Sequence, residues 1–363
     1  MRGQGAEPEV VDSDVSTGGA VLPPQAARLS FDAAALADNW RALDRMSGKA
    51  QAGAAVKANA YGTGVDRVVP TLAKAGCRQF YVAHWREGPA VMAHVPASMI
   101  SVLHGPANDA ETAFALATGL RPVLNSGQQV ERWRAAGGGV CDLMVDTGMN
   151  RLGLADRDWG DALNTLEIDT LLSHLACADE DNAMNMRQQA LFSQAITAIR
   201  HRRASLANSA GIALGSCYHH DLTRPGLALY GGVPRSELDG VIRDVVAPQA
   251  MILQTRQVPA GATIGYNATF TAPADMRIGI VSIGYADGYL RNWSGRGVFC
   301  HEGAVLPVIG RVSMDMVALD LAQAMQLGEG DWVTASYRLP DAARCSGLSQ
   351  YELLTLLGQR LHC

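Results

Sequence analysis

The stretch AGAAVKANAYGTG, residues 52–64, joins an apolar run to an abrupt polar end. AGAAV has the length and unbroken apolar character of a strand that is buried on both faces. Lys57 follows it directly. A solvated surface charge is one interpretation of Lys57, but the flanking run is almost free of polar side chains. The pattern therefore favours a lysine held at the carboxyl end of a buried strand.

Seven further runs of this kind follow along the chain. They are QFYVA (79–83), MISVL (99–103), RPVL (121–124), CDLMVD (141–146), TLLSHL (170–175), ASLAN (204–208) and HDLTR (220–224). Most intervals between them contain a segment with helical periodicity. Eight strand–helix units predict an α/β fold, a (β/α)8 TIM barrel. The alternative, a doubly wound open sheet, usually has fewer strands, and its Gly-x-Gly-x-x-Gly signature is absent after the first run.

The domain organisation follows from composition. The segment 28–240 would form the barrel, and its first helix can be capped by Asp32. The apolar face of that helix would contain Ala33, Leu36, Trp40 and Leu43. From about residue 241, Val-, Ile- and Met-rich segments separated by Gly, Pro and Asp predict a mostly-β domain, 241–363, with one helix at SQYELLTLLGQRL. Residues 1–27 are rich in Gly, Pro, Ser and acids, as in a flexible tail.

Composition also excludes several functions. The 363-residue chain has a net charge of −5 and no basic stripe, so nucleic acid is not an expected partner. No apolar run is long enough to cross a membrane. The seven cysteines are odd in number and form no Cys-x-x-Cys pair, which favours a reducing, cytoplasmic location. CYHHD, residues 217–221, matches no common zinc pattern, and we expect no metal site.

Polar residues lie at the carboxyl ends of several predicted strands, where barrels place their functional groups. These residues are Lys57, Arg151, His174, Asn208, Ser209 and Arg224. Phosphate sites in such barrels favour the loops after strands 7 and 8. Ser209 and the turn RPGL, 224–227, lie there. A lysine facing a phosphate site suits pyridoxal 5′-phosphate, which lysines hold as a Schiff base.

At this point the chain resembles a known family, the alanine racemases, which are pyridoxal-phosphate enzymes of fold-type III. The resemblance covers about residues 28–362. It is carried by AVKANAYGTG, VDTGMNRLG, SHLACADEDN, LANSAG, RPGLALYGG, GYNATF, IGYADGY and GRVSMDM, in the order of the family. The family supplies D-alanine for cell walls or takes part in alanine breakdown. The resemblance thus implies a racemase that interconverts L- and D-alanine.

The resemblance also implies a role for each matching residue. Lys57 would carry the cofactor, and Arg224 would face its pyridine nitrogen. The phosphate would be held by Tyr61, Ser209, Gly226 and Leu227, beside Asn208. His174 would lie near the ring and orient Arg224. Arg151 would contact a cofactor oxygen and the substrate carboxylate. Tyr266 would be a second base from the partner subunit of a head-to-tail homodimer, together with Tyr285 and Met314.

A two-base mechanism accounts for the pairing of Lys57 with Tyr266. Racemisation removes a proton from one face of Cα and returns one to the other face, so two bases on opposite sides suffice. Both side chains have ordinary pKa values of about 10, which the site must lower for them to act near neutrality. Arg224 would leave the pyridine nitrogen unprotonated, because a guanidinium does not give up its proton.

Three departures from the family pattern bear on the site. The family often has a carbamylated lysine where this chain has Met144, so no carbamate can orient Arg151. The family commonly has a phosphate-binding tyrosine near its carboxyl end, whereas this chain ends RLHC. We expect that contact to be missing, with either a lower phosphate affinity or another residue in its place. Ser313 replaces a cysteine of the family.

Three alternatives stay open on the sequence. A racemase of broad specificity, for serine as an example, would have the same two bases. A decarboxylase of this fold type would be expected to lack the tyrosine of GYNATF. A non-catalytic pyridoxal-phosphate-binding protein would consist of the barrel alone, without residues 241–363.

Overall fold

The computed structural model describes residues 23–361, so most of the predicted tail, 1–27, lies outside the described residues. The strands of the first domain are β2 (Gln51–Ala52), β3 (Ala54–Ala55), β4 (Phe80–Val82), β5 (Ile100–Val102), β6 (Arg121–Leu124), β7 (Cys141–Met144), β8 (Ile168–Leu172), β9 (Arg203–Ser205) and β10 (Leu222–Thr223). Each predicted run overlaps one of them, and β8 and β9 begin before the runs predicted for them. β2 and β3 are two halves of one strand, interrupted at Gly53.

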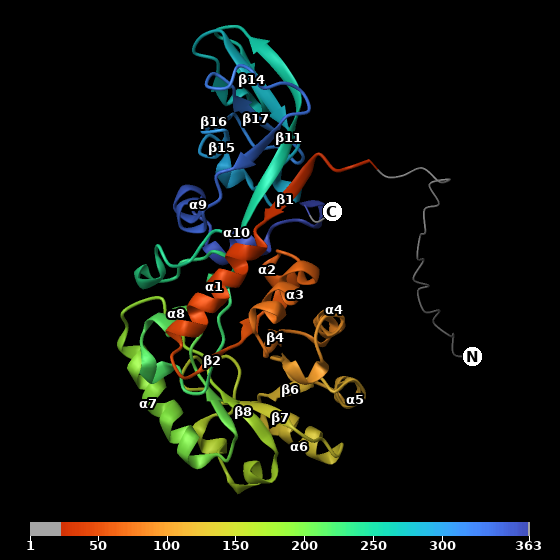
Figure 1. Cartoon of the computed structure of the whole chain (residues 1–363), viewed down its shortest axis with the longest axis vertical. Helices are drawn as coiled ribbons and strands as arrows, with labels where there is room; N and C mark the ends of the chain where they lie inside the picture. The colour runs from red at the N-terminus through yellow and green to blue at the C-terminus, as the bar shows by residue number, and fades with distance from the viewer. Residues whose placement is uncertain (1–22, 362–363) are drawn as a thin grey trace, which may run out of the picture.

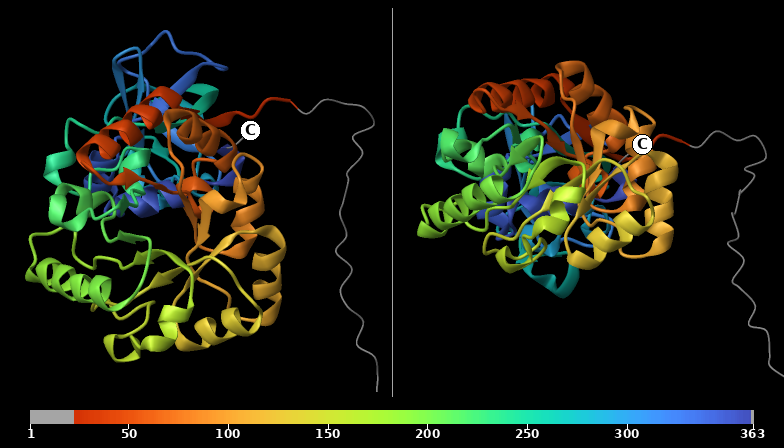
Figure 2. Two further views of the ribbon diagram at one scale, coloured as in Figure 1. Left: turned by 60° about the horizontal axis from the view of Figure 1, so that its bottom comes forward. Right: turned by 90° about the horizontal axis from the view of Figure 1, so that it is seen from below.

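These strands form the predicted eight-stranded barrel. β3 to β9 are parallel neighbours in chain order, and β10 pairs in parallel with β2. Between β9 and β10 the Asp221 N–H donates to the Ala204 carbonyl (3.1 Å) and the Arg224 N–H to that of Ala207 (2.8 Å). Figures 1 and 2 show the helices around the outside of these strands. The barrel fold is therefore confirmed.

The helices of the first domain are α1 (Ala33–Met46), α2 (Lys57–Tyr61), α3 (Val65–Ala75), α4 (Gly88–Met92), α5 (Asp109–Thr118), α6 (Gly127–Ala135), α7 (Ala183–Ala198) and α8 (Ser209–Ala213). Asp32 caps α1 by accepting a hydrogen bond from the Ala35 N–H (2.8 Å), as predicted. Leu36 and Leu43 are fully buried on that helix, but Ala33 is exposed. None of the helices in the described part of the chain is long and apolar enough to span a membrane.

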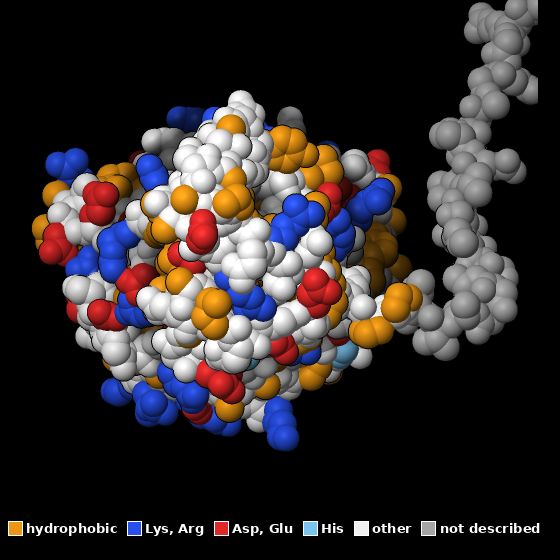
Figure 3. Space-filling view, turned by 90° about the horizontal axis from the view of Figure 1, so that it is seen from above, with side chains coloured by type: hydrophobic (Ala, Val, Ile, Leu, Met, Phe, Trp, Pro, Cys, Tyr) orange, Lys and Arg blue, Asp and Glu red, His pale blue; other side chains and the backbone are white. Residues whose placement is uncertain are grey.

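The second domain is an antiparallel β-barrel. Its strands are β11 (Val246–Val258), β12 (Thr263–Ile264), β13 (Phe270–Thr271), β14 (Met276–Val281), β15 (Val298–His301), β16 (Ala304–Ile309), β17 (Val317–Asp320) and β18 (Trp332–Ala335). β11 pairs with β14 along one part of its length and with β18 along another, so the sheet closes on itself. The predicted mostly-β architecture is confirmed. Seen from this end, the surface has hydrophobic, basic and acidic side chains interspersed (Figure 3).

Two features of the second domain were not predicted. β1 (Ala27–Phe31) precedes the barrel in sequence but pairs antiparallel with β11, so it belongs to the second sheet. Two helices, α9 (Leu339–Ser346) and α10 (Gln350–Thr355), follow the last strand where one was expected. The Gln350 side chain accepts from the Val233 N–H (2.8 Å) and donates to its carbonyl (3.0 Å). These bonds hold α10 against the barrel (Figure 1).

Candidate active site

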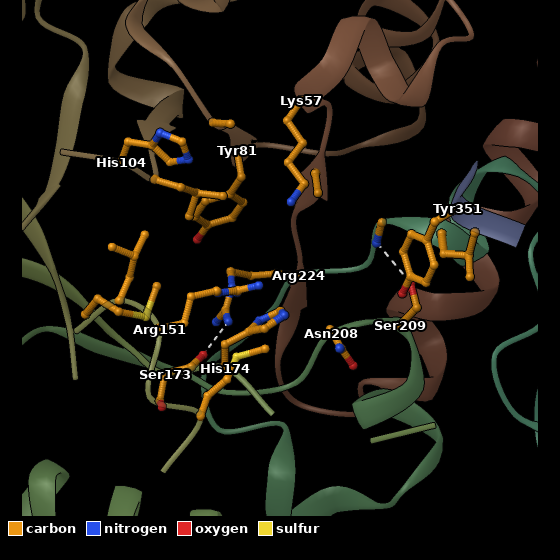
Figure 4. A pocket seen from close by; sticks show the side chains of 18 of the residues that line it. Lys57, Tyr81, His104, Arg151, Ser173, His174, Asn208, Ser209, Arg224 and Tyr351 are labelled. Carbon is orange, nitrogen blue, oxygen red and sulfur yellow. Dashed lines mark hydrogen bonds between the residues drawn. The ribbon is translucent and has the colours of Figure 1, made fainter. Parts of the chain in front are cut away.

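One cavity of about 520 Å³ opens at the carboxyl ends of the barrel strands. Its walls include nine residues singled out from the sequence: Lys57, Tyr61, Arg151, His174, Asn208, Ser209, Arg224, Gly226 and Leu227. Figure 4 shows the side chains of Lys57, Arg224 and His174 directed into this space from different strands and loops. The barrel therefore brings together residues that are separated by up to 170 positions in the chain.

Lys57 begins α2, separated from the end of β3 by one residue, at the rim of the barrel. Burial and the nearby Arg151 guanidinium lower the pKa of its ammonium, and the Glu87 carboxylate acts in the opposite direction. A lowered pKa increases the fraction of free amine, which is the form that attacks a carbonyl or accepts a proton.

The loops after β9 and β10 form a compact turn. The Ser209 hydroxyl oxygen accepts from the N–H groups of Gly226 (2.9 Å) and Ala228 (3.2 Å). A Cβ added to Gly226 would lie 2.3 Å from the Tyr61 hydroxyl oxygen, so only glycine allows Tyr61 to reach this turn. Burial raises the pKa of Tyr61, which keeps its phenol protonated as a donor. The hydroxyl groups of Tyr61 and Ser209 thus meet at a glycine-containing turn, which is a setting suited to a phosphate.

Arg224 is a buried cation at the base of the cavity. It donates hydrogen bonds to the Ser205 hydroxyl and the Ser173 carbonyl, both at 2.5 Å. Burial and the charges of Arg224, Arg151 and Lys57 lower the pKa of His174 to about 3, so its imidazole is neutral near pH 7. Ser173 and Ser205 thus hold Arg224 in place, and orientation by His174 stays a prediction.

Asn208 links the two halves of the turn. It caps α8, because its side-chain oxygen accepts from the Gly211 N–H (2.8 Å), and it forms a parallel bridge with Arg224. Its amide therefore fixes the start of α8, and with it the position of Ser209, relative to Arg224.

Tyr351 also lines the cavity, and the sequence interpretation missed it. It comes from α10 of the second domain, and its ring centroid lies 6.3 Å from that of Tyr61. Burial raises its pKa, as does the Asp179 carboxylate. The terminal RLHC has no tyrosine, as the sequence shows, and Tyr351 brings a different phenol to the cavity. Tyr351 lies twelve residues before the end of the chain. The helical sequence pattern around it does not indicate that this helix packs beside the cavity.

Met144 stands at the position where the family resemblance would place a carbamylated lysine. Its side chain is only 7% exposed and packs inside the barrel with Tyr81, Val123, Leu172 and Leu222. Within residues 23–361 the Arg151 side chain makes no hydrogen bond or ion pair, and its positive charge acts on Lys57 and His174. Met144 is therefore an apolar packing residue, and it offers Arg151 no charged partner.

Tyr266, Tyr285 and Met314 do not line this cavity. Tyr266 is 64% exposed and Met314 is 53% exposed. Tyr285 and Met314 lie on adjoining loops, since the Tyr285 N–H donates to the Ser313 carbonyl and the Ala286 N–H to that of Met314, both at 3.0 Å. Tyr266 borders a shallow depression of about 400 Å³ with Ser313 and other residues of the second domain. One chain thus carries two separate groups of predicted site residues.

The motif CYHHD has a structural role, as expected. His219 is buried, and its ring nitrogens lie 3.1 Å from the Ser47 carbonyl and 2.9 Å from that of Ile212. No cluster of three or more potential metal ligands occurs among residues 23–361.

The fold and the cavity define a class of protein: a two-domain enzyme whose parallel barrel places a half-buried lysine in one cavity with a glycine-containing turn suited to a phosphate. Family models for the alanine racemase N-terminal domain and C-terminal domain match residues 31–234 and 245–363. This chain belongs to the alanine racemase family.

Individual relatives agree with this assignment. The alanine racemase of Methylobacterium sp. (strain 4-46) is 42% identical over 359 residues, which cover 93% of this chain and 97% of the relative. A protein of Agrobacterium fabrum named "Alanine racemase, catabolic" is 40% identical over 92% of this chain and 90% of its own length. The crystal structure of alanine racemase from Bartonella henselae with covalently bound pyridoxal phosphate matches with a TM-score of 0.85 and 34% identity, over 93% of this chain and 98% of that one.

Proposed function

We propose that this protein interconverts L- and D-alanine and uses pyridoxal 5′-phosphate as its cofactor. The observation that carries the proposal is the shared cavity of Lys57, Arg224 and the Ser209–Gly226 turn. No single residue of this set is diagnostic. Together they offer, in one cavity, an amine for a carbonyl, a cation for a ring nitrogen and a turn for a phosphate.

The residues of the cavity fit this cofactor. Tyr61 and Ser209 supply hydroxyls at the turn, and the closeness of Gly226 to Tyr61 excludes any side chain at position 226. Leu227 follows in the same turn, and Tyr351 adds a phenol from the second domain. When bound, the cofactor supplies delocalisation of the electron pair that remains at Cα after proton removal.

Arg224 and His174 set the electrostatics around the ring. A guanidinium keeps its proton, so Arg224 can donate a hydrogen bond to a ring nitrogen but does not protonate it. The neutral His174 adds no second positive charge there. Arg151, which has no anionic partner among the described residues, would bind the substrate carboxylate.

Lys57 would hold or release a proton at Nζ on one face of the substrate. Tyr266 would do the same at its phenolic oxygen on the other face. Because Tyr266 is exposed and lies outside the cavity of its own chain, we propose a homodimer in which Tyr266, Tyr285 and Met314 reach the cavity of the partner. A cytoplasmic location, drawn from the cysteine usage, is part of the same proposal.

The direct test is the conversion of L-alanine to D-alanine by purified Lys57→Ala and Tyr266→Phe variants. Loss of racemisation in both supports two bases, and full activity in either contradicts the mechanism. Rates with serine and lysine beside alanine distinguish a strict racemase from one of broad specificity. A protein that binds the cofactor but racemises none of the three would be a non-catalytic binding protein.

Subunit sharing has its own test. Lys57→Ala and Tyr266→Phe subunits are mixed under conditions of verified exchange. If each cavity borrows Tyr266 from its partner, one of the two sites in a mixed dimer is intact, and random pairing restores about a quarter of wild-type activity. If both bases come from one chain, mixing restores no activity.

A further inference from the structure

After Lys57, the backbone of α2 winds in the left-handed direction, which is unusual for L-amino acids. Ala58, Asn59, Ala60 and Tyr61 have φ angles of 54°, 50°, 54° and 55°. None of them is glycine. Left-handed φ brings the Cβ of an L-residue too close to the following carbonyl oxygen, so single residues adopt it occasionally and consecutive runs are rare. Some interaction around this turn must select it over the right-handed form.

The handedness of the turn decides what reaches the cavity. Lys57 precedes the turn and Tyr61 ends it, and both line the cavity. The Tyr61 hydroxyl lies against Gly226 only because the backbone winds this way. A right-handed turn starting at the same Lys57 would direct residue 61 to another side of the chain. The turn therefore couples the position of the amine to the position of the phenol.

One carboxylate holds the start of this turn. Glu87 Oε1 accepts a hydrogen bond from the Ala58 N–H (2.7 Å), the peptide group that directly follows Lys57. Its Oε2 accepts from the N–H groups of Ala83 (2.7 Å) and His84 (3.2 Å), just after β4. Hydrogen bonds to a carboxylate are stronger than those between neutral groups. Glu87 thus ties the peptide after Lys57 to the end of the neighbouring strand.

The far end of the turn is held by other contacts. Asn59 Oδ1 accepts from the Val65 N–H (2.9 Å), and the Gly62 N–H donates to the Ala58 carbonyl (2.8 Å). A Cβ on Gly62 would lie 2.3 Å from the Leu354 carbonyl oxygen of α10. These contacts fix where the turn ends, whereas Glu87 makes the side-chain contact to its first N–H.

We propose that Glu87 is a positioning residue that acts through the Ala58 N–H to hold the left-handed turn and thereby sets Lys57 and Tyr61 in the cavity. This role rests on the proposed function. Glu87 does not touch the substrate. Its two oxygens serve two separate backbone segments, so glutamine, which has one acceptor oxygen, can satisfy only one of them and turns its amide N–H groups toward the other.

The test compares Glu87→Gln with Glu111→Gln in the full-length protein. Glu111 is a matched control, since its carboxylate also accepts from a backbone N–H at this rim, that of Ala107 (2.7 Å), but belongs to the next loop. Glu87→Gln is expected to lower kcat for alanine by about 10- to 100-fold, with a smaller change in KM. Hydrogen exchange in residues 57–62 is expected to accelerate. Glu111→Gln is expected to change neither.

A second substitution separates positioning from a general loss of structure. Ala58 is exposed, and glycine adopts left-handed φ without steric cost. Adding Ala58→Gly to Glu87→Gln is therefore expected to recover part of kcat and to slow the exchange of the turn. Glu87→Gln with wild-type kcat and wild-type exchange in residues 57–62 would overturn the proposal, as would a defect that Ala58→Gly leaves unchanged.

The exchange measurement also distinguishes the two proposals. If the wild-type protein does not racemise alanine, the proposed function fails, yet faster exchange in Glu87→Gln would still establish the restraint on the turn. If racemisation is present but Glu87→Gln matches Glu111→Gln in both readouts, only the role of Glu87 fails.

Discussion

Gly226→Ala tests the geometry of the cofactor cradle. The added methyl group would lie 2.3 Å from the Tyr61 hydroxyl oxygen and 3.0 Å from the adjoining ring carbon. Normal contact requires Tyr61 to retreat by about 1 Å. The ring has little room, because it stacks on the fully buried Tyr230 with a centroid distance of 4.8 Å. Tyr61 is therefore expected to lose the hydrogen bond that we propose it donates to the cofactor phosphate at this turn.

The expected size of the effect follows from that hydrogen bond. A hydrogen bond to a charged group contributes about 1.5–3 kcal/mol, so the dissociation constant for pyridoxal phosphate should rise about 10- to 150-fold. The assay is a binding titration of cofactor-free protein. Gly127→Ala is the control, since a Cβ there meets open space. Its affinity should stay at the wild-type value.

A double-mutant cycle with Tyr61→Phe completes the test. If Gly226→Ala acts by displacing the Tyr61 hydroxyl, its effect on affinity should shrink once that hydroxyl is removed, which gives a coupling energy of about 1 kcal/mol or more. Two additive effects, or a change below about threefold in Gly226→Ala, would refute the reasoning that only glycine lets Tyr61 serve the phosphate.

Two further predictions concern stability. The pKa of His174 is lowered from 6.5 to about 3, so between these pH values the unfolded chain binds more protons than the folded protein. The free energy of unfolding should therefore fall as the pH drops from 6.5 toward 3. Chemical denaturation should show a shallower fall in His174→Gln, and equal slopes in the two proteins would contradict the assigned burial. Arg360→Ala removes ion pairs to the buried Asp287 (2.8 Å) and to Asp315 (2.9 Å), which should destabilise the protein by about 1–3 kcal/mol. Arg344→Ala, at an exposed pair with Asp341, should cost less than about 1 kcal/mol in the same denaturation experiment.

The barrel and its rim were predictable because they depend on local sequence. Each buried parallel strand needs a short apolar run, and the polar residue that ends the run lies at the same edge of the sheet as those of its neighbours. Lys57, His174 and Arg224 could be placed together on this basis alone. Their roles toward a cofactor came from the family resemblance.

Features that depend on long-range packing were not predictable. β1 has no local signal that distinguishes a strand of the barrel from one that pairs with β11, more than 200 residues later. Tyr351 reaches the cavity because α10 packs on the barrel, and its helical sequence pattern is the same wherever that helix lies. The left-handed turn contains no glycine among residues 58–61, so its handedness comes from contacts such as that of Glu87.

The two-base mechanism at Lys57 and Tyr266 is tested most directly by exchange of the Cα proton in deuterated water. Each enantiomer of alanine is incubated separately with Tyr266→Phe, and deuterium at Cα is followed by NMR together with the enantiomer formed. With Lys57 as the remaining base on one face, the account predicts exchange in one enantiomer only and little racemisation. Exchange at comparable rates in both enantiomers, or racemisation at the wild-type rate, would contradict it.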